Sequence, residues 1–260
     1  MAPNELILEN MTKRFGGLIA VDDLSMTVKE GKIYGIIGPN GAGKTTVFNC
    51  ITGIYRCEEG EIYWRGETLR GLTPYQVVNR GIVRTFQTIR LFGQMSVAEN
   101  IMSGRHIKSR QKWYHGIFHT PASRRDEKKN WRKVKELLEF FNLLQFAATP
   151  SQSLPYGIQR RVEMARAMAA EPTLLILDEP AAGLNDKETM ELLETIFAIR
   201  DQGVTILLIE HDMDMVMEVT DYITVLNFGK KIAEGTPTQI QKDPAVIEAY
   251  LGSEDDDDEF

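Results

Sequence analysis

A glycine-rich segment between an apolar run and a helical stretch constrains this chain more than any other feature. The segment reads Gly38-Pro-Asn-Gly-Ala-Gly-Lys-Thr-Thr46 and fits the spacing G-x-x-x-x-G-K-[ST]. The run before it, Ile33-Tyr-Gly-Ile-Ile37, is typical of a buried strand, and residues 47–52 after it are typical of a helix. We therefore expect a strand, a phosphate-binding loop and a helix in direct succession.

The residue types in this loop suit the binding of a phosphate group. Glycines at positions 38, 41 and 43 tolerate positive φ angles, so backbone N–H groups can turn inward around an anion, and the next helix points its N-terminus at the same anion. Lys44 would neutralise the β and γ oxygens of ATP, and Thr45 would coordinate Mg²⁺. The residues expected to bind the nucleotide here are Gly38, Asn40, Gly41, Gly43, Lys44, Thr45 and Thr46.

Two adjacent acids, Asp178 and Glu179, follow the apolar run 174–177. Ligands bind at the C-terminal ends of strands in open α/β sheets. There Asp178 would hold Mg²⁺ through water, and Glu179 would act as general base on the attacking water. Alone, such a pair after a strand is more often a solvated loop. Together with the phosphate loop it predicts a catalytic site.

The order of the predicted elements indicates an α/β fold. Apolar strands at 174–177 and 204–209 flank a helix over 186–200, which argues for a parallel sheet with helices on its faces. Residues 96–170 read as mostly helical and predict a helical insertion. No apolar stretch approaches the roughly 18 residues that span a bilayer, and the first residues lack the pattern of a signal peptide. With two cysteines and no disulfide framework, we expect a cytoplasmic protein.

The net charge of −7 combines segments of opposite sign. Residues 105–135, called the basic belt below, hold 11 basic and 2 acidic residues with aromatic residues among them. Such a mixture suits a membrane interface or nucleic acid, and a solvated helical face is the open alternative. Residues 254–259 are all acidic, so residues 253–260 are expected to form a disordered tail.

Further motifs stand in a fixed order along the chain. They are Thr85-Phe-Gln87, Leu154-Pro-Tyr-Gly157, Asp178-Glu-Pro180, Ala182-Gly-Leu-Asn185 and Glu210-His-Asp212. With the phosphate loop, this series resembles the ATP-binding-cassette family over nearly the whole chain. The motifs correspond to the glutamine loop, signature, second acidic motif, D-loop and switch histidine of that family.

The resemblance implies a domain organisation. It implies a P-loop NTPase core with a mostly parallel sheet, an N-terminal antiparallel β subdomain and an inserted α-helical subdomain over about 93–170. The whole ATP-binding domain would cover residues 1–252.

The resemblance also assigns roles to single residues. Phe15 matches an aromatic residue that stacks on adenine, although a core position is its alternative. Gln87 would contact Mg²⁺ and the attacking water, and His211 would bind the γ-phosphate. Cassettes of this kind form head-to-tail dimers, in which Tyr156 and Gly157 would face the ATP held by the other subunit.

The signature of this chain departs from the family pattern. Pro155 and Ile158 replace the usual serine and glutamine, so contacts with ATP of the other subunit should be fewer. The helix that follows places Ile158, Val162, Ala165 and Ala169 on one face, and Arg160, Arg161 and Arg166 on others.

Several details resemble the ATP-binding subunits of branched-chain amino acid importers. They are the Leu-Pro-Tyr-Gly signature, the Ala-Ala-Gly-Leu-Asn D-loop, the long insertion between Gln87 and the signature, and the ending 234–252. Subunits of urea and short-amide importers and of the lipopolysaccharide exporter remain alternatives, as does a soluble cassette ATPase that acts on DNA or ribosomes. The importer resemblance implies a second ATP-binding subunit or a second copy, membrane permeases and a substrate-binding protein as partners, with no nucleic acid. It also implies a location on the inner face of the membrane, where the basic belt would meet anionic lipid or a partner.

Overall fold

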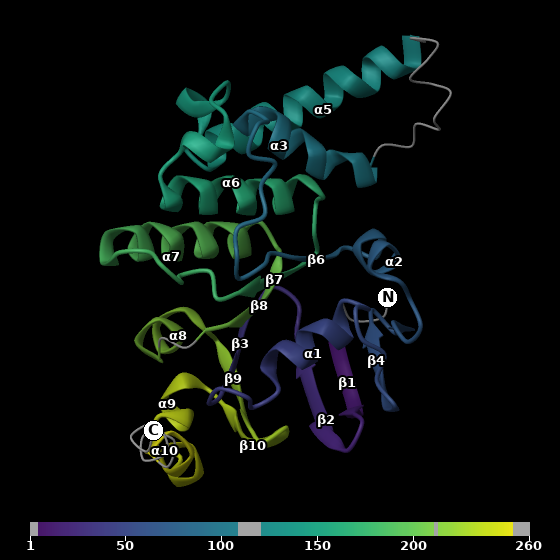
Figure 1. The fold of residues 1–260 in the computed structure, drawn as a ribbon, viewed down its shortest axis with the longest axis vertical. Helices are drawn as coiled ribbons and strands as arrows, with labels where there is room; N and C mark the ends of the chain where they lie inside the picture. Colours follow the sequence, from purple (N-terminus) through teal and green to yellow (C-terminus); the bar gives the residue numbers. More distant parts are fainter. Residues whose placement is uncertain (1–4, 109–120, 211–212, 252–260) are drawn as a thin grey trace. The chain divides into compact units, whose positions relative to one another are not determined.

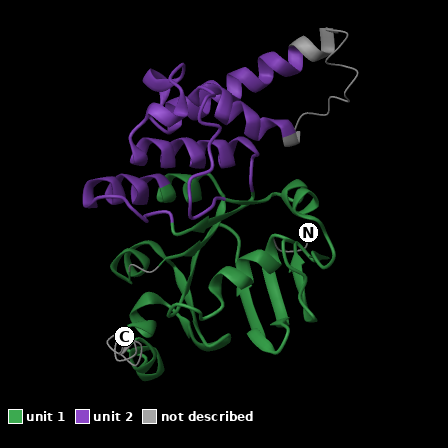
Figure 2. Cartoon of the chain, in the orientation of Figure 1, with its two compact units in different colours: residues 1–84, 173–179, 196–260 green, residues 85–172, 180–195 purple. Residues whose placement is uncertain are grey.

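The chain divides into two compact units, which are described separately (Figure 2). The computed structural model describes residues 5–108, 121–210 and 213–251. Unit 1 comprises residues 1–84, 173–179 and 196–260, and unit 2 comprises residues 85–172 and 180–195. The helical segment predicted over about 93–170 falls inside unit 2. The chain therefore leaves unit 1 twice and returns to it twice.

Unit 1 contains a six-stranded sheet in the order β10-β9-β3-β8-β7-β6 (Figure 1). All its neighbouring strands are parallel except for β10, which pairs with β9 in the antiparallel sense. Every residue of β3, β7 and β8 is buried, which explains why their sequences are apolar throughout. The predicted parallel sheet is confirmed. Its strands are β3 (Ile33–Ile37), β6 (Ile82–Arg84), β7 (Leu174–Asp178), β8 (Thr205–Ile209), β9 (Tyr222–Asn227) and β10 (Lys230–Gly235).

A four-stranded antiparallel sheet with the order β2-β1-β4-β5 forms the rest of the β structure of unit 1. Helix α1 (Lys44–Ile51) joins the two sheets, because Phe48 shares one core with Leu24 of this sheet and Ile176 of the other. The helix begins three residues earlier than predicted, directly after Gly43. The elements are β1 (Leu6–Phe15), β2 (Leu18–Val28), β4 (Glu59–Trp64), β5 (Glu67–Thr68) and the short helix α2 (Pro74–Asn79).

The opposite face of the six-stranded sheet is covered by α8 (Met213–Val219), α9 (Pro237–Ile240) and α10 (Pro244–Leu251). Val216, Ile240 and Val246 from these helices pack against Ile37 and Ile223 of the sheet. Both faces of the sheet are thus buried, as the apolar strands require.

Unit 2 is helical. Ser96 begins α3, because its hydroxyl accepts a hydrogen bond from the backbone N–H of Glu99 at 3.3 Å. Helix α5 buries Val134, Leu137 and Leu138 on one side. None of the described helices has both the length and the apolar character needed to cross a membrane. The elements are α3 (Val97–Gly104), η1 (Arg105–Lys108), α5 (Pro121–Phe140), η2 (Leu144–Phe146), η3 (Ser151–Ser153), α6 (Tyr156–Ala169) and the first part of α7 (Asp186–Asp201).

Candidate functional site

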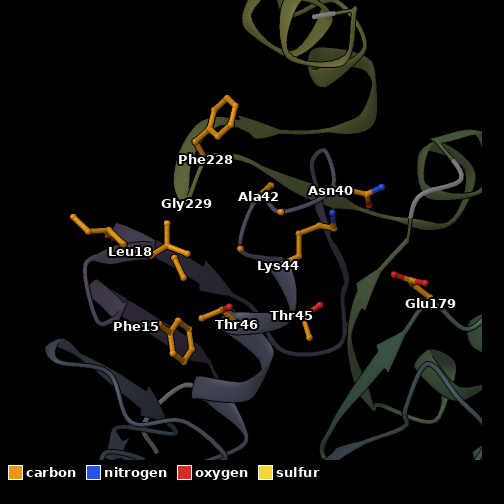
Figure 3. Close-up of a pocket in the computed structure, with 14 residues that line it drawn as sticks. Phe15, Leu18, Asn40, Ala42, Lys44, Thr45, Thr46, Glu179, Phe228 and Gly229 are labelled. Carbon is orange, nitrogen blue, oxygen red and sulfur yellow. The ribbon is translucent and has the colours of Figure 1, made fainter. Parts of the chain in front are cut away.

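A pocket of about 470 Å³ in unit 1 gathers most of the residues predicted for the phosphate loop (Figure 3). It is built by the end of β1, the start of β2, the loop into α1, the residue after β7 and the turn between β9 and β10. Positions as far apart as 15 and 229 therefore line one cavity. The lining residues are Phe15, Leu18, Ile19, Ala20, Asn40, Gly41, Ala42, Gly43, Lys44, Thr45, Thr46, Glu179, Phe228 and Gly229.

The loop before α1 has a backbone that requires glycine at two positions. Gly38 has φ 148° and Gly43 has φ 100°, both in the region that favours glycine. A Cβ atom at Gly38 would also collide with the carbonyl oxygen of Leu226, and one at Gly43 with that of Ala20. The loop is therefore held tightly between the two sheets, with the N-terminus of α1 opening onto the pocket.

Lys44 lies inside this loop and is only 6% exposed. Its ammonium donates hydrogen bonds to the carbonyl oxygens of Gly38 at 2.6 Å and Pro39 at 2.9 Å. Burial lowers the pKa of Lys44, and the carboxylate of Glu179 partly opposes this shift. A buried ammonium at a pocket favours the binding of an anion, such as a phosphate oxygen.

Glu179 lines the same pocket in a strained backbone conformation. It follows β7 directly and has φ 47°, which is rare for a residue with a side chain. Its backbone N–H donates to the carbonyl oxygen of Ile209 at 2.9 Å, which helps to hold this conformation. Such strain is characteristic of functional sites, where a side chain must point in one direction. Here that direction is toward the pocket (Figure 3).

Asp178, the last residue of β7, is buried and paired with an arginine. Arg84 Nη2 lies 2.6 Å from Asp178 Oδ2, and Arg84 Nη1 donates to Asn49 Oδ1 at 2.7 Å. The two side chains of this ion pair are each 7% exposed, so the guanidinium supplies the buried carboxylate with a charged partner. Sequence reasoning found Asp178 but missed Arg84, because an arginine that ends a three-residue strand carries no local signal.

A divalent cation such as Mg²⁺ fits the polar groups of this region. Mg²⁺ keeps several waters and is usually bound by one or two protein oxygens together with phosphate oxygens of the substrate. The hydroxyl of Thr45 and the carboxylate of Asp178 are oxygen donors of this kind. Across residues 5–108, 121–210 and 213–251, no group of three or more His, Cys, Asp or Glu side chains could hold a metal without such help. The donor set therefore fits a cation that arrives with a phosphate ligand.

Phe15 forms one wall of the pocket. Its side chain is 42% exposed, which is inconsistent with the alternative that it is a core residue. Its ring meets Tyr55 edge to face at 5.1 Å, and Lys13 Nζ lies 4.9 Å from the ring centroid. These contacts fix the ring at the rim of the pocket, where stacking on a flat ligand stays a prediction.

Gln87 and Tyr156 belong to unit 2 and are described within it. The backbone carbonyl oxygen of Gln87 accepts a hydrogen bond from Arg160 Nη2 at 2.9 Å. Tyr156 is the first residue of α6, and its hydroxyl accepts from the same nitrogen at 3.1 Å. His211 lies outside the described residues, so its role also stays a prediction.

The predicted signature and D-loop lie at the starts of α6 and α7. Pro155 occupies the cap position of α6 and gives no side-chain hydrogen bond. Next to it, the carboxylate of Glu188 lies where a Cβ atom on Gly157 would be, so a larger residue there would have to displace that side chain. The side chain of Asn185 accepts a hydrogen bond from the backbone N–H of Glu188 at 3.0 Å, so Asn185 caps α7.

Several residues at the pocket were not anticipated from the sequence. Phe228 and Gly229 form a two-residue turn between β9 and β10, with φ angles of 44° and 80° that fit a type I′ hairpin. On α10, Tyr250 makes a hydrogen bond with the backbone of Gly38, and burial raises the pKa of its phenol to about 12. The glycine at position 229 is a weak indication of a turn in the sequence. Nothing in the sequence around Tyr250 indicates its contact with the loop at Gly38.

Family models and curated proteins match this chain over most of its length. A family model described as ABC transporter matches residues 21–182, and one described as branched-chain amino acid ATP-binding cassette transporter matches residues 230–256. The chain is 47% identical to the high-affinity branched-chain amino acid transport ATP-binding protein BraF of Pseudomonas aeruginosa, and 46% identical to LivG of Escherichia coli, which has the same description. Each alignment spans 248 residues, or 95% of this chain and 97% of the relative.

Solved structures of similar fold include an ATP-binding cassette of an ABC transporter in its ADP conformation. It superposes on this chain with a TM-score of 0.83 and 33% identity, covering 95% of this chain and 98% of that one. The superposition extends across nearly all of the elements described above.

Proposed function

Because this chain belongs to the ABC transporter family of ATP-binding proteins, we propose that it is the ATP-hydrolysing subunit of an importer for branched-chain amino acids. The 47% identity to BraF and the family match over residues 230–256 support this cargo. Importers of urea or short amides use similar subunits, and the cargo never touches this subunit. The experiment described below therefore compares the two cargo classes.

The observation that carries the proposal is the pocket of unit 1. It combines a loop that requires glycine, the buried ammonium of Lys44 and the carboxylate of Glu179 in one cavity. A regulatory module that only binds nucleotide needs the first two features but has no use for a base. Glu179 in its strained conformation therefore supports hydrolysis rather than binding alone.

In the proposed mechanism the phosphates of ATP enter the loop, and Lys44 exchanges the carbonyls of Gly38 and Pro39 for β and γ oxygens. Glu179 accepts a proton from the attacking water while the water oxygen bonds to the γ-phosphorus, and ADP leaves as the bond to its β-phosphate oxygen breaks. Mg²⁺, held by Thr45 and Asp178, would neutralise charge on the β and γ oxygens.

The remaining roles are those that the family resemblance assigns to single residues of each unit and to partner proteins. Phe15 stacks on adenine, which its exposed ring at the pocket supports. Gln87 would contact Mg²⁺ and the attacking water, and His211 would bind the γ-phosphate. Tyr156 and Gly157 face the ATP of the opposite subunit, which is a second copy or a second ATP-binding protein. Permeases carry the cargo, and a substrate-binding protein delivers it.

The cargo can be tested through its effect on hydrolysis. ATPase activity of this chain, assembled in liposomes with its permease partners, should rise severalfold when the binding protein is loaded with leucine, because loaded partners favour the closed state. Phosphate release measures the effect, with urea as the matched cargo. Stimulation by urea and not by leucine would make the assignment to amino acids wrong, and stimulation by DNA or ribosomes alone would exclude transport.

The basic belt supports a location at the membrane. Among its described residues Lys128, Lys129 and Arg132 are exposed on α5. Arg105 is an exception, because it is buried and paired with Glu171, so it stabilises unit 2 and is not part of a charged surface. Residues 109–120 of the belt lie outside the described residues. We place the exposed part of the belt against anionic lipid headgroups.

Reversal of the charges on α5 tests this placement. Each cation near an anionic surface contributes about 1 kcal/mol, so a fourfold Lys/Arg→Glu change should weaken binding to anionic vesicles by at least roughly tenfold. Stability should change little, because the ion pairs that are lost are exposed. Vesicle co-sedimentation measures binding. The residues to change are Lys128, Lys129, Arg132 and Lys133.

A matched control reverses four exposed lysines outside α5, namely Lys29, Lys187, Lys230 and Lys242. If both fourfold variants lose binding equally, or neither does, net charge or another surface governs association and the belt has no special role.

A further inference from the structure

A buried ion pair lies inside helix α6. Arg160 Nη1 and Glu163 Oε2 are 2.9 Å apart, and each side chain is 1% exposed. The amphipathic pattern of the helix predicted Arg160 on another face than the apolar one, so its burial is a finding of the structure. Burying two charges carries a desolvation penalty that pairing alone often does not offset. The other hydrogen bonds that the two side chains make are therefore described next, because they help to offset this penalty.

The guanidinium of Arg160 holds two consecutive carbonyl oxygens. Nη1 donates to the oxygen of Phe86 at 2.9 Å, and Nη2 donates to that of Gln87 at 2.9 Å. Nη2 also donates to the hydroxyl of Tyr156 at 3.1 Å. The planar fork of an arginine suits this set of acceptors, which a lysine could not reach in the same geometry. One side chain therefore links the backbone at Gln87 to the start of α6.

Glu163 holds the other end of the same segment. Its Oε1 accepts a hydrogen bond from the backbone N–H of Arg90 at 3.3 Å, and Arg166 Nη2 lies 4.0 Å away. The guanidinium of Arg90 in turn lies over the ring of Phe86, 4.7 Å from its centroid. The ion pair thus fastens both ends of residues 86–90, called the glutamine loop here, to α6. All these residues belong to unit 2.

We propose that Arg160 and Glu163 are positioning residues for ATP hydrolysis, which hold the glutamine loop to α6 so that Gln87 and the start of α6 move as one body. The proposal rests on the proposed function, in which Gln87 meets the attacking water and the start of α6 meets the ATP of the opposite subunit. Neither charged group needs to touch the nucleotide, since both act through Gln87. Any displacement of the glutamine loop by a membrane partner would then carry α6 with it.

The first test replaces both partners at once, as Arg160→Met with Glu163→Met. Loss of one partner alone would leave an unpaired buried charge and strongly destabilise the chain, whereas a paired apolar replacement is often neutral in stability. We expect a melting temperature close to that of the unchanged protein, a KM for ATP within about twofold and a kcat at least about tenfold lower. A kcat equal to that of the unchanged protein would overturn the proposal.

A second measurement separates positioning from a structural role. Gln87→Ala should lower kcat in the unchanged protein but by less than about twofold in the double variant, because both changes remove the same function. Arg105→Met is the control, since Arg105 donates to Ala169 O at 2.9 Å and supports the other end of α6. In that background Gln87→Ala should keep its full effect. A full effect of Gln87→Ala in the double variant as well would overturn the proposal.

Hydrogen exchange supplies a readout that does not depend on hydrolysis. Backbone amides of the glutamine loop should exchange at least about tenfold faster in the double variant, while those of α6 remain protected. Unchanged exchange in the loop would overturn the proposal even if hydrolysis fell. Faster exchange in a protein that never hydrolyses ATP would instead retain the link and reject the proposed function.

Discussion

Replacement of Glu179 by glutamine should lower the turnover of ATP by about 10²-fold to 10⁴-fold and leave the affinity for ATP within about twofold. Glutamine has nearly the same shape as glutamate, so the pocket and the hydrogen bond from the backbone N–H of residue 179 to Ile209 are preserved. The amide cannot accept the proton of the attacking water. Steady-state phosphate release and equilibrium binding of a fluorescent ATP analogue measure the two quantities.

The matched control for this variant is Glu171→Gln. Glu171 also has a positive φ, of 51°, but it belongs to unit 2 and pairs with Arg105 rather than lining the pocket. Its replacement should leave turnover within about twofold, because surface and structural carboxylates do not enter the chemistry. If Glu179→Gln keeps most of its turnover, another group is the base, and the assignment of the pocket as a catalytic site is wrong.

Replacement of Lys44 by methionine should weaken ATP binding by at least about 100-fold, since the charge-assisted contacts of the ammonium with two phosphates are lost. The unliganded protein should melt within a few degrees of the unchanged one, because the charge that is removed is buried and its pKa is already lowered by that burial. ATP at 100 times Kd stabilises a protein by about 2.7 kcal/mol, so at that concentration it should raise the melting temperature of the unchanged protein clearly and that of Lys44→Met little.

Lys231→Met is the control for this change. Lys231 also donates to a backbone carbonyl oxygen, that of Ser25 at 2.7 Å, but it lies outside the pocket. ATP should raise the melting temperature of this variant as it does for the unchanged protein. An equal rise in Lys44→Met would mean that ATP does not bind through the loop.

Contiguity explains which parts of the site could be predicted from the sequence. The strand, loop and helix around Lys44 are consecutive in the chain, and the conformations they require restrict the residue types to glycine and a few polar ones. Asp178 and Glu179 follow the run 174–177, which is apolar at every position. Such a run predicts a strand that is buried on both faces, as β7 is. In each case the conformation that the local sequence favours is the one that the tertiary structure requires, so the local pattern predicts it correctly.

The parts that were not predicted depend on which distant segments the fold brings together. The turn at Phe228 and Gly229 reaches the pocket because β9 pairs with β3, which no local pattern encodes. Arg84 meets Asp178 because β6 pairs with β7. Arg160 is buried because the fold supplies carbonyl oxygens from residues more than 70 positions away, whereas the helical pattern alone assigned it to another face. Partners supplied by tertiary structure decide where such charges lie.

Uptake of leucine by proteoliposomes tests the central claim most directly, namely that hydrolysis at the pocket of this chain powers transport. Vesicles would contain this chain, its permeases, any second ATP-binding subunit and the loaded binding protein. With the unchanged chain or Glu171→Gln, ATP should drive accumulation of labelled leucine. With Glu179→Gln, accumulation should fall to the level seen without ATP. Accumulation that is undiminished with Glu179→Gln would contradict the account.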